Sequence, residues 1–207
     1  MFTGIITNIG EVKKMVRTVT GMSVSVKCDA ASLDAKKGDS IAVDGVCLTV
    51  TSSEKDIIIF DVVGNTLKKT GLSSLTSGDR VNMECAARMG DKMGGHMVSG
   101  HVDGVRAIKE FRKTSNGWIL DIAVQGGDRS FLVPRGSVTI DGISLTVAEV
   151  YDNFFRVYVI PETIEATTLS SKRVGDRVNV EFDIMAKYAK QREQGVTEDK
   201  LRDAGFI

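Results

Sequence analysis

The chain contains few of the residues that build disulfide frameworks and metal sites. Its 207 residues include 3 cysteines and 2 histidines. The cysteines, Cys28, Cys47 and Cys85, are odd in number and show no C-x-x-C spacing, which favours reduced thiols over disulfide bonds or a zinc site. His96 and His101 are too few for a histidine-rich metal centre, so we expect no bound metal.

An excess of one charge and a long apolar run are also missing. Lysine plus arginine and aspartate plus glutamate both number 27, so no basic surplus points to nucleic acid. No stretch of about 18 apolar residues occurs, which argues against a membrane span. The first residues, MFTGIITNIG, have no basic lead before a long apolar run and do not resemble a signal peptide. These features predict a cytoplasmic protein that binds neither nucleic acid nor a membrane.

The chain does contain an internal repeat. "DGVCLTV" at 44–50 returns as "DGISLTV" at 141–147, a shift of 97 positions. The same shift places "GDRVNME" on "GDRVNVE", whereas "MFTG" at 1–4 matches "MVSG" at 97–100 after 96 positions. The order is kept over the whole length. A period of this size corresponds to a small domain and not to a solenoid repeat, so we predict two tandem domains.

Each copy has the pattern of short strands. Apolar and small polar residues alternate in "SIAVDGVCLTV" around an Asp-Gly turn. Several short strands in about 90 residues suggest a small antiparallel barrel or sandwich. Leu48, Val50, Leu145 and Val147 are predicted core residues, and we expect most of the 8 methionines in the cores as well.

The predicted boundaries follow the repeat and the glycine-rich stretch RMGDKMGG. We predict a first domain over residues 1–96, a second over 97–183 and a tail over 184–207. The tail begins with the helix-like IMAKYAKQREQG, which has no counterpart in the first copy. Its apolar side carries Met185 and Tyr188.

A duplicated structural barrel with no catalytic role would show the same core pattern. The informative positions are therefore polar residues at equivalent strand sites, such as Cys47 with Ser144 and Thr49 with Thr146. A matched set in both copies, beside glycines that let a ligand approach the backbone, favours two related binding sites.

Six motifs together resemble the riboflavin synthase family: MFTGII, GVCLTV, GGHMVSGHVDG, IDGISLTV, IPETIEATTL and KRVGDRVNVEFD. The resemblance spans the chain from Met1 to the tail. It implies an all-β fold of two six-stranded antiparallel Greek-key barrels with a C-terminal α-helix, assembled as a homotrimer. It also implies an activity without cofactor or metal, in which two 6,7-dimethyl-8-ribityllumazine molecules give riboflavin and 5-amino-6-ribitylaminouracil. Association with lumazine synthase is left open.

The resemblance also implies site residues, grouped here by repeat. The first pocket would use Gly4, Ile5, Ile6, Cys47, Leu48, Thr49, Asp61, Val62, Val63, Gly64, Asn65 and Thr66. The second would use Gly100, His101, Val102, Ser144, Leu145, Thr146, Tyr158, Val159, Ile160, Pro161, Glu162 and Thr163. Phe2, Ser40, Arg135, Asp141 and Asp183 fall on further matching positions. The implied catalytic group is His101, Cys47, Ser144, Asp141 and Asp183.

Three positions depart from the family pattern. Arg135 stands where the family usually has Lys, and Asp44 where it has Asn. Asn65 stands where the second copy keeps Glu162. The arginine keeps the charge but replaces a point charge by a planar fork.

The chemistry needs a base near the acidic C7 methyl of one lumazine, or stabilisation of its anion. His101 is the candidate base, because histidine ordinarily changes charge near neutral pH, but a binding role is equally open. His96 is expected to be structural. Cys47, Ser144 or an activated water could form the adduct at C7 of the partner lumazine, with a polar binding role favoured for Cys47.

Two other functions compete with this reading. A lumazine- or flavin-carrying protein of the same superfamily would bind without turnover, although Cys47, His101, Asp141 and Ser144 favour an enzyme. A flavin-dependent reductase would need a following βαβ nucleotide-binding domain, for which the 24 residues of 184–207 leave no room.

Overall fold

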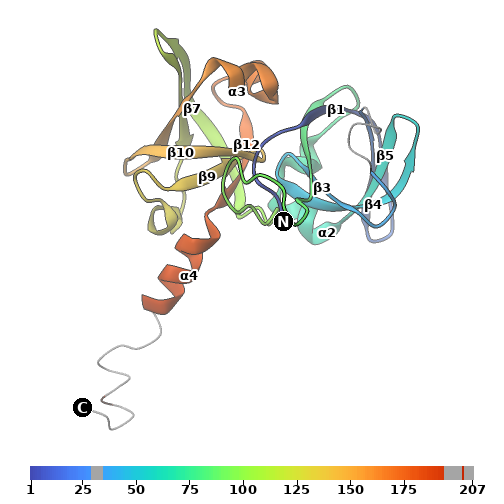
Figure 1. Cartoon of the computed structure of the whole chain (residues 1–207), viewed down its shortest axis with the longest axis horizontal. Helices are drawn as coiled ribbons and strands as arrows, with labels where there is room; N and C mark the ends of the chain where they lie inside the picture. Colours follow the sequence, from blue (N-terminus) through green and yellow to red (C-terminus); the bar gives the residue numbers. More distant parts are fainter. Residues whose placement is uncertain (29–34, 194–201, 203–207) are drawn as a thin grey trace.

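Two closed six-stranded barrels lie side by side in the computed structural model, which describes residues 1–28, 35–193 and 202 (Figure 1). The first barrel consists of β1 (Asn8–Arg17), β2 (Gly21–Lys27), β3 (Ser40–Val43), β4 (Val46–Glu54), β5 (Ile57–Val63) and β6 (Arg80–Cys85). The second consists of β7 (Gly104–Thr114), β8 (Gly117–Ala123), β9 (Ser137–Ile140), β10 (Ile143–Val150), β11 (Phe154–Val159) and β12 (Arg177–Phe182).

Two pairs of short helices, α2 with α3 and η1 with η3, occupy equivalent places in the two copies. The α-helices are α2 (Gly64–Lys69), α3 (Pro161–Ala166) and the C-terminal α4 (Ile184–Glu193); the 3-10 helices are η1 (Gly71–Ser74), η2 (Asp128–Phe131) and η3 (Thr168–Ser171). None of the described helices is long and apolar enough to span a membrane.

Both barrels have the same antiparallel topology. The strand order is β1-β2-β5-β4-β3-β6 in the first and, in equivalent positions, β7-β8-β11-β10-β9-β12 in the second. Three strands joined by hairpins are followed by a fourth that returns beside the first of them, which is a Greek key. The predicted all-β fold with two six-stranded barrels and a terminal helix is confirmed.

The barrel interiors are filled by every second residue of each strand, because successive side chains point to opposite faces. Leu48 and Val50 are buried in the first core, and Leu145 and Val147 in the second, as predicted. The prediction that most methionines lie in the cores was wrong. Five of the eight are exposed, and Met83 is the one methionine among the fully buried side chains of the described residues. The exposed methionines lie outside the strands, where no barrel interior is available. They are in the N-terminal segment (residues 1–7), in the linker between the barrels (residues 86–103) and in α4.

The repeated Asp-Gly phrase forms the contact between the barrels. Asp44 and Gly45 have φ values of 44° and 77°, and Asp141 and Gly142 have 44° and 83°, as expected for two-residue turns between antiparallel strands. A Cβ added to Gly45 would lie 2.7 Å from the backbone nitrogen of Gly142, and one on Gly142 would lie 2.8 Å from that of Gly45. Both positions therefore require glycine.

Reciprocal hydrogen bonds surround this backbone contact. The Asn82 amide N–H donates to Asp44 Oδ1 over 2.8 Å, and its side chain donates to the carbonyl of Asp141 over 2.8 Å. Asn179 repeats the pattern, with its amide on Asp141 Oδ1 and its side chain on the Asp44 carbonyl. The asparagines come from β6 and β12, so the second repeated phrase, "GDRVN", supplies the bonds that hold the first.

One cation breaks the symmetry of this interface. Lys172 lies 2.9 Å from Asp141 Oδ2, while its counterpart in the first copy is Leu75. Burial, together with repulsion from Asp141, holds the pKa of Asp44 well above its ordinary value. Burial also raises the pKa of Asp141, although Lys172 opposes the shift. Burial alone would lower the pKa of Lys172, but the pairing with Asp141 more than offsets it and the pKa is raised.

Asp44→Asn is expected to stabilise the protein at pH 8 and to have a smaller effect near pH 4. The raised pKa of Asp44 means that the folded state binds more protons than the unfolded state above the ordinary aspartate pKa, so stability falls as pH rises through that window. Asparagine removes the charge and keeps the acceptor for Asn82. We expect a gain of about 1 to 2 kcal/mol at pH 8, measured by urea unfolding.

The matched control for this prediction is Asp141→Asn. It leaves the half-buried ammonium of Lys172 without its carboxylate and should destabilise the protein at pH 8. An Asp44→Asn effect of equal size at both pH values would contradict the placement of an ionisable carboxyl group there.

Candidate active site

The N-terminal segments of the two repeats are exchanged between the barrels. Phe2 and Val98 form an antiparallel bridge, with N–H to O distances of 2.8 and 3.1 Å. Beyond it, the amide of Ser144 donates to the carbonyl of Gly4 over 2.8 Å, and the amide of Cys47 donates to the carbonyl of Gly100 over 2.9 Å. Each segment therefore lies on a strand of the other repeat's barrel.

Because of this exchange, the predicted grouping of the pocket residues was wrong: residues 4–6 do not share a site with Cys47, and residues 100–102 do not share one with Ser144. Gly4 is pressed against Ser144, since an added Cβ would lie 2.6 Å from the Ser144 Cβ. Ile6 packs against the second core, and Val102 against the first. The segment of residues 4–6 accordingly belongs with the second barrel, and the segment of residues 100–102 with the first.

A buried glutamate on each barrel fixes the segment that leaves it. Glu84 accepts hydrogen bonds from the Thr3 amide and hydroxyl, both over 2.7 Å, and from the Gly4 amide over 3.0 Å. Glu181 binds Ser99 and Gly100 with the same three distances. Burial raises the pKa of Glu84, partly offset by these bonds. Neither glutamate was among the predicted residues, although both end the repeated phrase "GDRVN-x-E".

The first pocket is a cavity of about 250 Å³ beside β4 and α2. Its lining residues are Val46, Cys47, Asn65, Thr66, Lys69, Thr70, Gly100, His101 and Val102. Cys47 is half-buried and His101 is exposed, so both are open to a ligand. His101 thus shares a pocket with Cys47 and not, as predicted from the repeat, with Ser144.

The equivalent place on the second barrel contains a hydrogen-bonded histidine. His96 Nδ1 lies 2.7 Å from Ser144 Oγ, and His96 Nε2 lies 3.2 Å from Thr139 Oγ1. Burial lowers the pKa of His96, although the charges of Asp183 and Glu181 oppose the shift. The imidazole is therefore neutral at neutral pH. A neutral imidazole against a hydroxyl can take up the proton of that hydroxyl, which is the arrangement that activates an oxygen nucleophile.

His96 was expected to be structural, and its contact with Ser144 was missed. The sequence signal was the pair of glycines before it, Gly94 and Gly95. A Cβ at Gly95 would lie 2.2 Å from the Thr3 carbonyl oxygen and 2.8 Å from Ser144 Oγ, so only glycine lets the linker pass close enough for the histidine to reach the serine.

The remaining predicted residues divide by exposure. Phe2, Leu48, Val62, Leu145 and Val159 are buried. Thr49, Asp61, Val63, Thr146, Tyr158, Ile160, Pro161 and Glu162 are exposed along the strand ends and the start of α3, where a ligand can reach them. Gly64 and Thr163 are half-buried beside them. Asp141 lies in the barrel interface, and Asp183 accepts from the Met185 amide at the start of α4.

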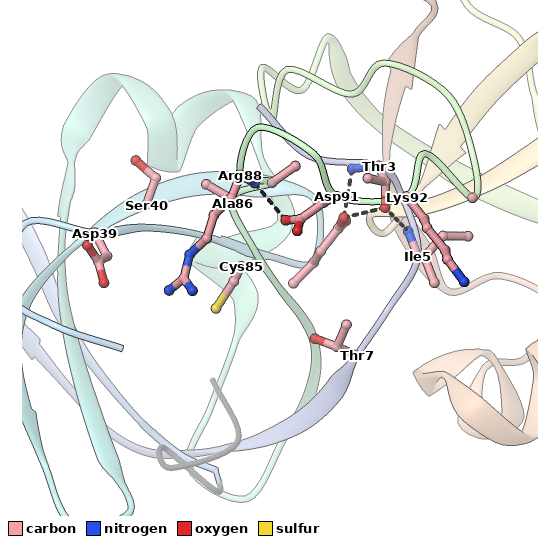
Figure 2. A pocket seen from close by; sticks show the side chains of 13 residues that line it. Thr3, Ile5, Thr7, Asp39, Ser40, Cys85, Ala86, Arg88, Asp91 and Lys92 are labelled. Atoms are coloured by element: carbon pink, nitrogen blue, oxygen red, sulfur yellow. Dashed lines mark hydrogen bonds between the residues drawn. The ribbon is translucent and has the colours of Figure 1, made fainter. Parts of the chain in front are cut away.

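Two predicted residues lie away from these groups. Arg135 is exposed and has a φ of 69°, in a place where the first repeat has Gly38. Ser40 is part of the wall of a larger cavity of about 720 Å³ between β3, the N-terminal segment and the linker. Figure 2 shows Asp39 and Ser40 on one side of this cavity and Thr3, Ile5 and Lys92 on the other.

Comparisons with known proteins agree with this geometry. Residues 3–86 and 99–183 both match the family described as lumazine binding domain. Riboflavin synthases from Bacillus subtilis (strain 168) and Actinobacillus pleuropneumoniae are 38% and 40% identical over the full length of both chains. The enzyme of that name from Mycobacterium bovis is 43% identical and covers 92% of this chain and 97% of its own.

Solved structures of a more distant protein share the fold. LumP complexed with riboflavin superposes with a TM-score of 0.80 at 24% identity, covering 88% of this chain and all of LumP. LumP complexed with 6,7-dimethyl-8-(1'-D-ribityl) lumazine gives 0.79 at 22% identity. Because both repeats match the lumazine binding domain and the relatives match from end to end, the chain belongs to the riboflavin synthase family.

Proposed function

We propose that this chain converts two molecules of 6,7-dimethyl-8-ribityllumazine into riboflavin and 5-amino-6-ribitylaminouracil by transferring a four-carbon unit from one to the other. The pair of equivalent sites at Cys47 and Ser144 carries the proposal, because at each a strand of one barrel binds the exchanged segment of the other repeat, and at Cys47 the two line a cavity. The full-length relatives named riboflavin synthase support the same activity.

Two identical reactants explain why the pockets are related. The atoms of two lumazines equal those of the two products, so the reaction needs no external oxidant or reductant. The protein's contribution is to hold two rings in register. In favourable cases this lowers the activation barrier by up to about 7–11 kcal/mol, because the entropy of bringing the reactants together is lost on binding and less solvent has to reorganise. The two rings have different fates, so the pockets must differ chemically.

The second pocket is suited to activating an oxygen nucleophile. His96 can accept a proton from Ser144, or from a water bound there, and the oxygen can then add to C7 of the lumazine in this pocket. Thr139 binds the other ring nitrogen and fixes the orientation of the imidazole. The first pocket, with Cys47 and His101, would hold the lumazine that loses a proton from its C7 methyl.

The outer face of α4 supports assembly with further copies. Lys187 pairs with Asp103 over 2.6 Å, and Lys190 Nζ lies 4.4 Å from the centre of the Phe131 ring, so this side of the helix is held by its own barrel. Met185 and Tyr188 are 69% and 64% exposed. An isolated helix of this length is marginal in water, and an apolar outer face favours contact with another copy, as in the homotrimer that the family resemblance implies.

The proposed function predicts that purified protein converts lumazine alone, with no added cofactor. Riboflavin should appear by absorbance and fluorescence, with one riboflavin formed for every two lumazines consumed. A carrier protein would bind the lumazine without producing riboflavin, and that outcome would reject the proposal.

His96→Gln is expected to lower kcat by about 10²-fold with ligand affinity nearly unchanged, because glutamine keeps hydrogen-bonding capacity but cannot act as a base. Thr139→Val, which removes only the second bond of the imidazole, should cause a smaller loss. Since the pKa of His96 is lowered, wild-type kcat should stay high down to a pH below the ordinary histidine value and fall only beneath it. If the fall in kcat that depends on His96 began at a pH above the ordinary histidine pKa, the result would contradict a neutral imidazole at this position.

The double variant Met185→Glu, Tyr188→Glu is expected to dissociate the oligomer and abolish most turnover while ligand binding survives. The charges face outward and leave the Lys187–Asp103 pair in place. Sedimentation velocity, lumazine fluorescence titration and the riboflavin assay measure the three effects. Gln191→Glu, an exposed change on the same helix, serves as the control. A monomeric variant with full activity would show that the site does not need a second copy.

A further inference from the structure

The first pocket and the equivalent site on the second barrel differ in the charges that their residues carry. In the first, α2 places Asn65 and Lys69 at the cavity. The equivalent positions on α3, after the shift of 97, are Glu162 and Ala166. The first repeat thus has a neutral amide where the second has a carboxylate, and an ammonium where the second has a methyl group. The repeat provides an internal comparison, because α2 and α3 follow the equivalent strands β5 and β11 with at most one residue between them.

Lys69 is the one amino group at the first cavity. Among the nine described residues that line it, none is a carboxylate and the other ionisable side chains are Cys47 and His101. Lys69 is exposed and takes part in none of the ion pairs found in the described part of the chain. Its charge is therefore available to a ligand. The adjacent Lys68 is also exposed but does not line the cavity.

The proposed reaction supplies an anion of matching chemistry. When a lumazine ionises, a C–H bond of its C7 methyl breaks, the electron pair stays on the ligand and spreads over the ring, and the proton passes to a base or to water. An ammonium about 4 Å from such an anion in a solvent-exposed pocket is worth roughly a fivefold change in the ratio of anionic to neutral ligand. A carboxylate, as at Glu162, acts in the opposite direction.

We propose that Lys69 makes the first pocket selective for the anionic ring, so that this pocket holds the lumazine that has lost its C7 methyl proton. The inference rests on the proposed function for the identity of the ligand. It also assigns the two fates: the first pocket holds the carbon nucleophile, and the second pocket, with His96 and Ser144, holds the ring that is attacked.

The test compares Lys69→Met with Lys69→Arg and Lys68→Met in the full chain. The absorbance spectrum of bound lumazine is titrated with pH, because the neutral and anionic rings absorb differently. Lys69→Met should reduce the ratio of anion affinity to neutral affinity by about fivefold, while the other two variants leave it unchanged. Cys47, Asp61, Lys68, His101 and Asp103 also carry titratable groups on the surrounding elements, and they are common to wild type and Lys69→Met.

Two further ligands separate a charge effect from other causes. Riboflavin is neutral, so its affinity should change less than twofold in Lys69→Met; an equal loss for riboflavin and the lumazine anion would show a packing role and overturn the proposal. Flavin mononucleotide carries a phosphate at the ribityl end. A loss confined to this ligand would assign the charge to that end of the pocket and overturn selectivity for the ring.

A Glu162→Gln variant provides the arm for the second pocket. If Glu162→Gln raises the bound anion fraction while Lys69→Met has no effect, the anion resides in the second pocket and the assignment is reversed. Failure of the proposed function is distinguishable from these outcomes, because it appears as absence of riboflavin in the wild-type assay whatever the binding preference of Lys69→Met.

Discussion

The two Asp-Gly turns meet backbone to backbone between the barrels, and the rest of the structure is arranged around that contact. Gly45 and Gly142 approach so closely that a methyl group on either would collide with the other's amide nitrogen. Asn82 and Asn179 close the contact from both sides. The turns begin β4 and β10, so the strands that carry Cys47 and Ser144 start at fixed positions relative to each other. A constraint on backbone approach thereby sets the geometry of both pockets.

Exchange of the terminal segments couples the pockets to this interface. Glu84 holds the segment that contacts Ser144, and Glu181 holds the segment that contacts Cys47, so each barrel positions a wall of the other's pocket. A carboxylate that accepts three hydrogen bonds in a buried site leaves the segment little freedom. Separating the barrels would therefore remove the exchanged segment from both sites at once.

The barrels could be predicted from sequence because their signals are local. The repeat, the alternation in "SIAVDGVCLTV" and the Asp-Gly turns specify strands and hairpins without knowledge of distant contacts. The exchange could not be predicted in the same way. Whether residues 4–6 lie on their own barrel or on the other is decided by tertiary contacts that leave the pattern of the segment unchanged. The contact between His96 and Ser144 could not be predicted for a related reason, since a single histidine has no geometry until the linker places it against the serine.

Duplication with exchange gives two barrels of the same strand order, and the chain distinguishes their sites through the side chains that it places there. The first pocket combines a thiol, an exposed imidazole and the ammonium of Lys69. At the second, Ser144 is hydrogen-bonded to a half-buried neutral imidazole, and Glu162 stands in the place of Asn65. A positive field favours an electron-rich ring, whereas a hydroxyl with a base behind it favours addition to an electron-poor one. Because substrate shape is the same on both sides, charge is the property that remains to separate donor from acceptor.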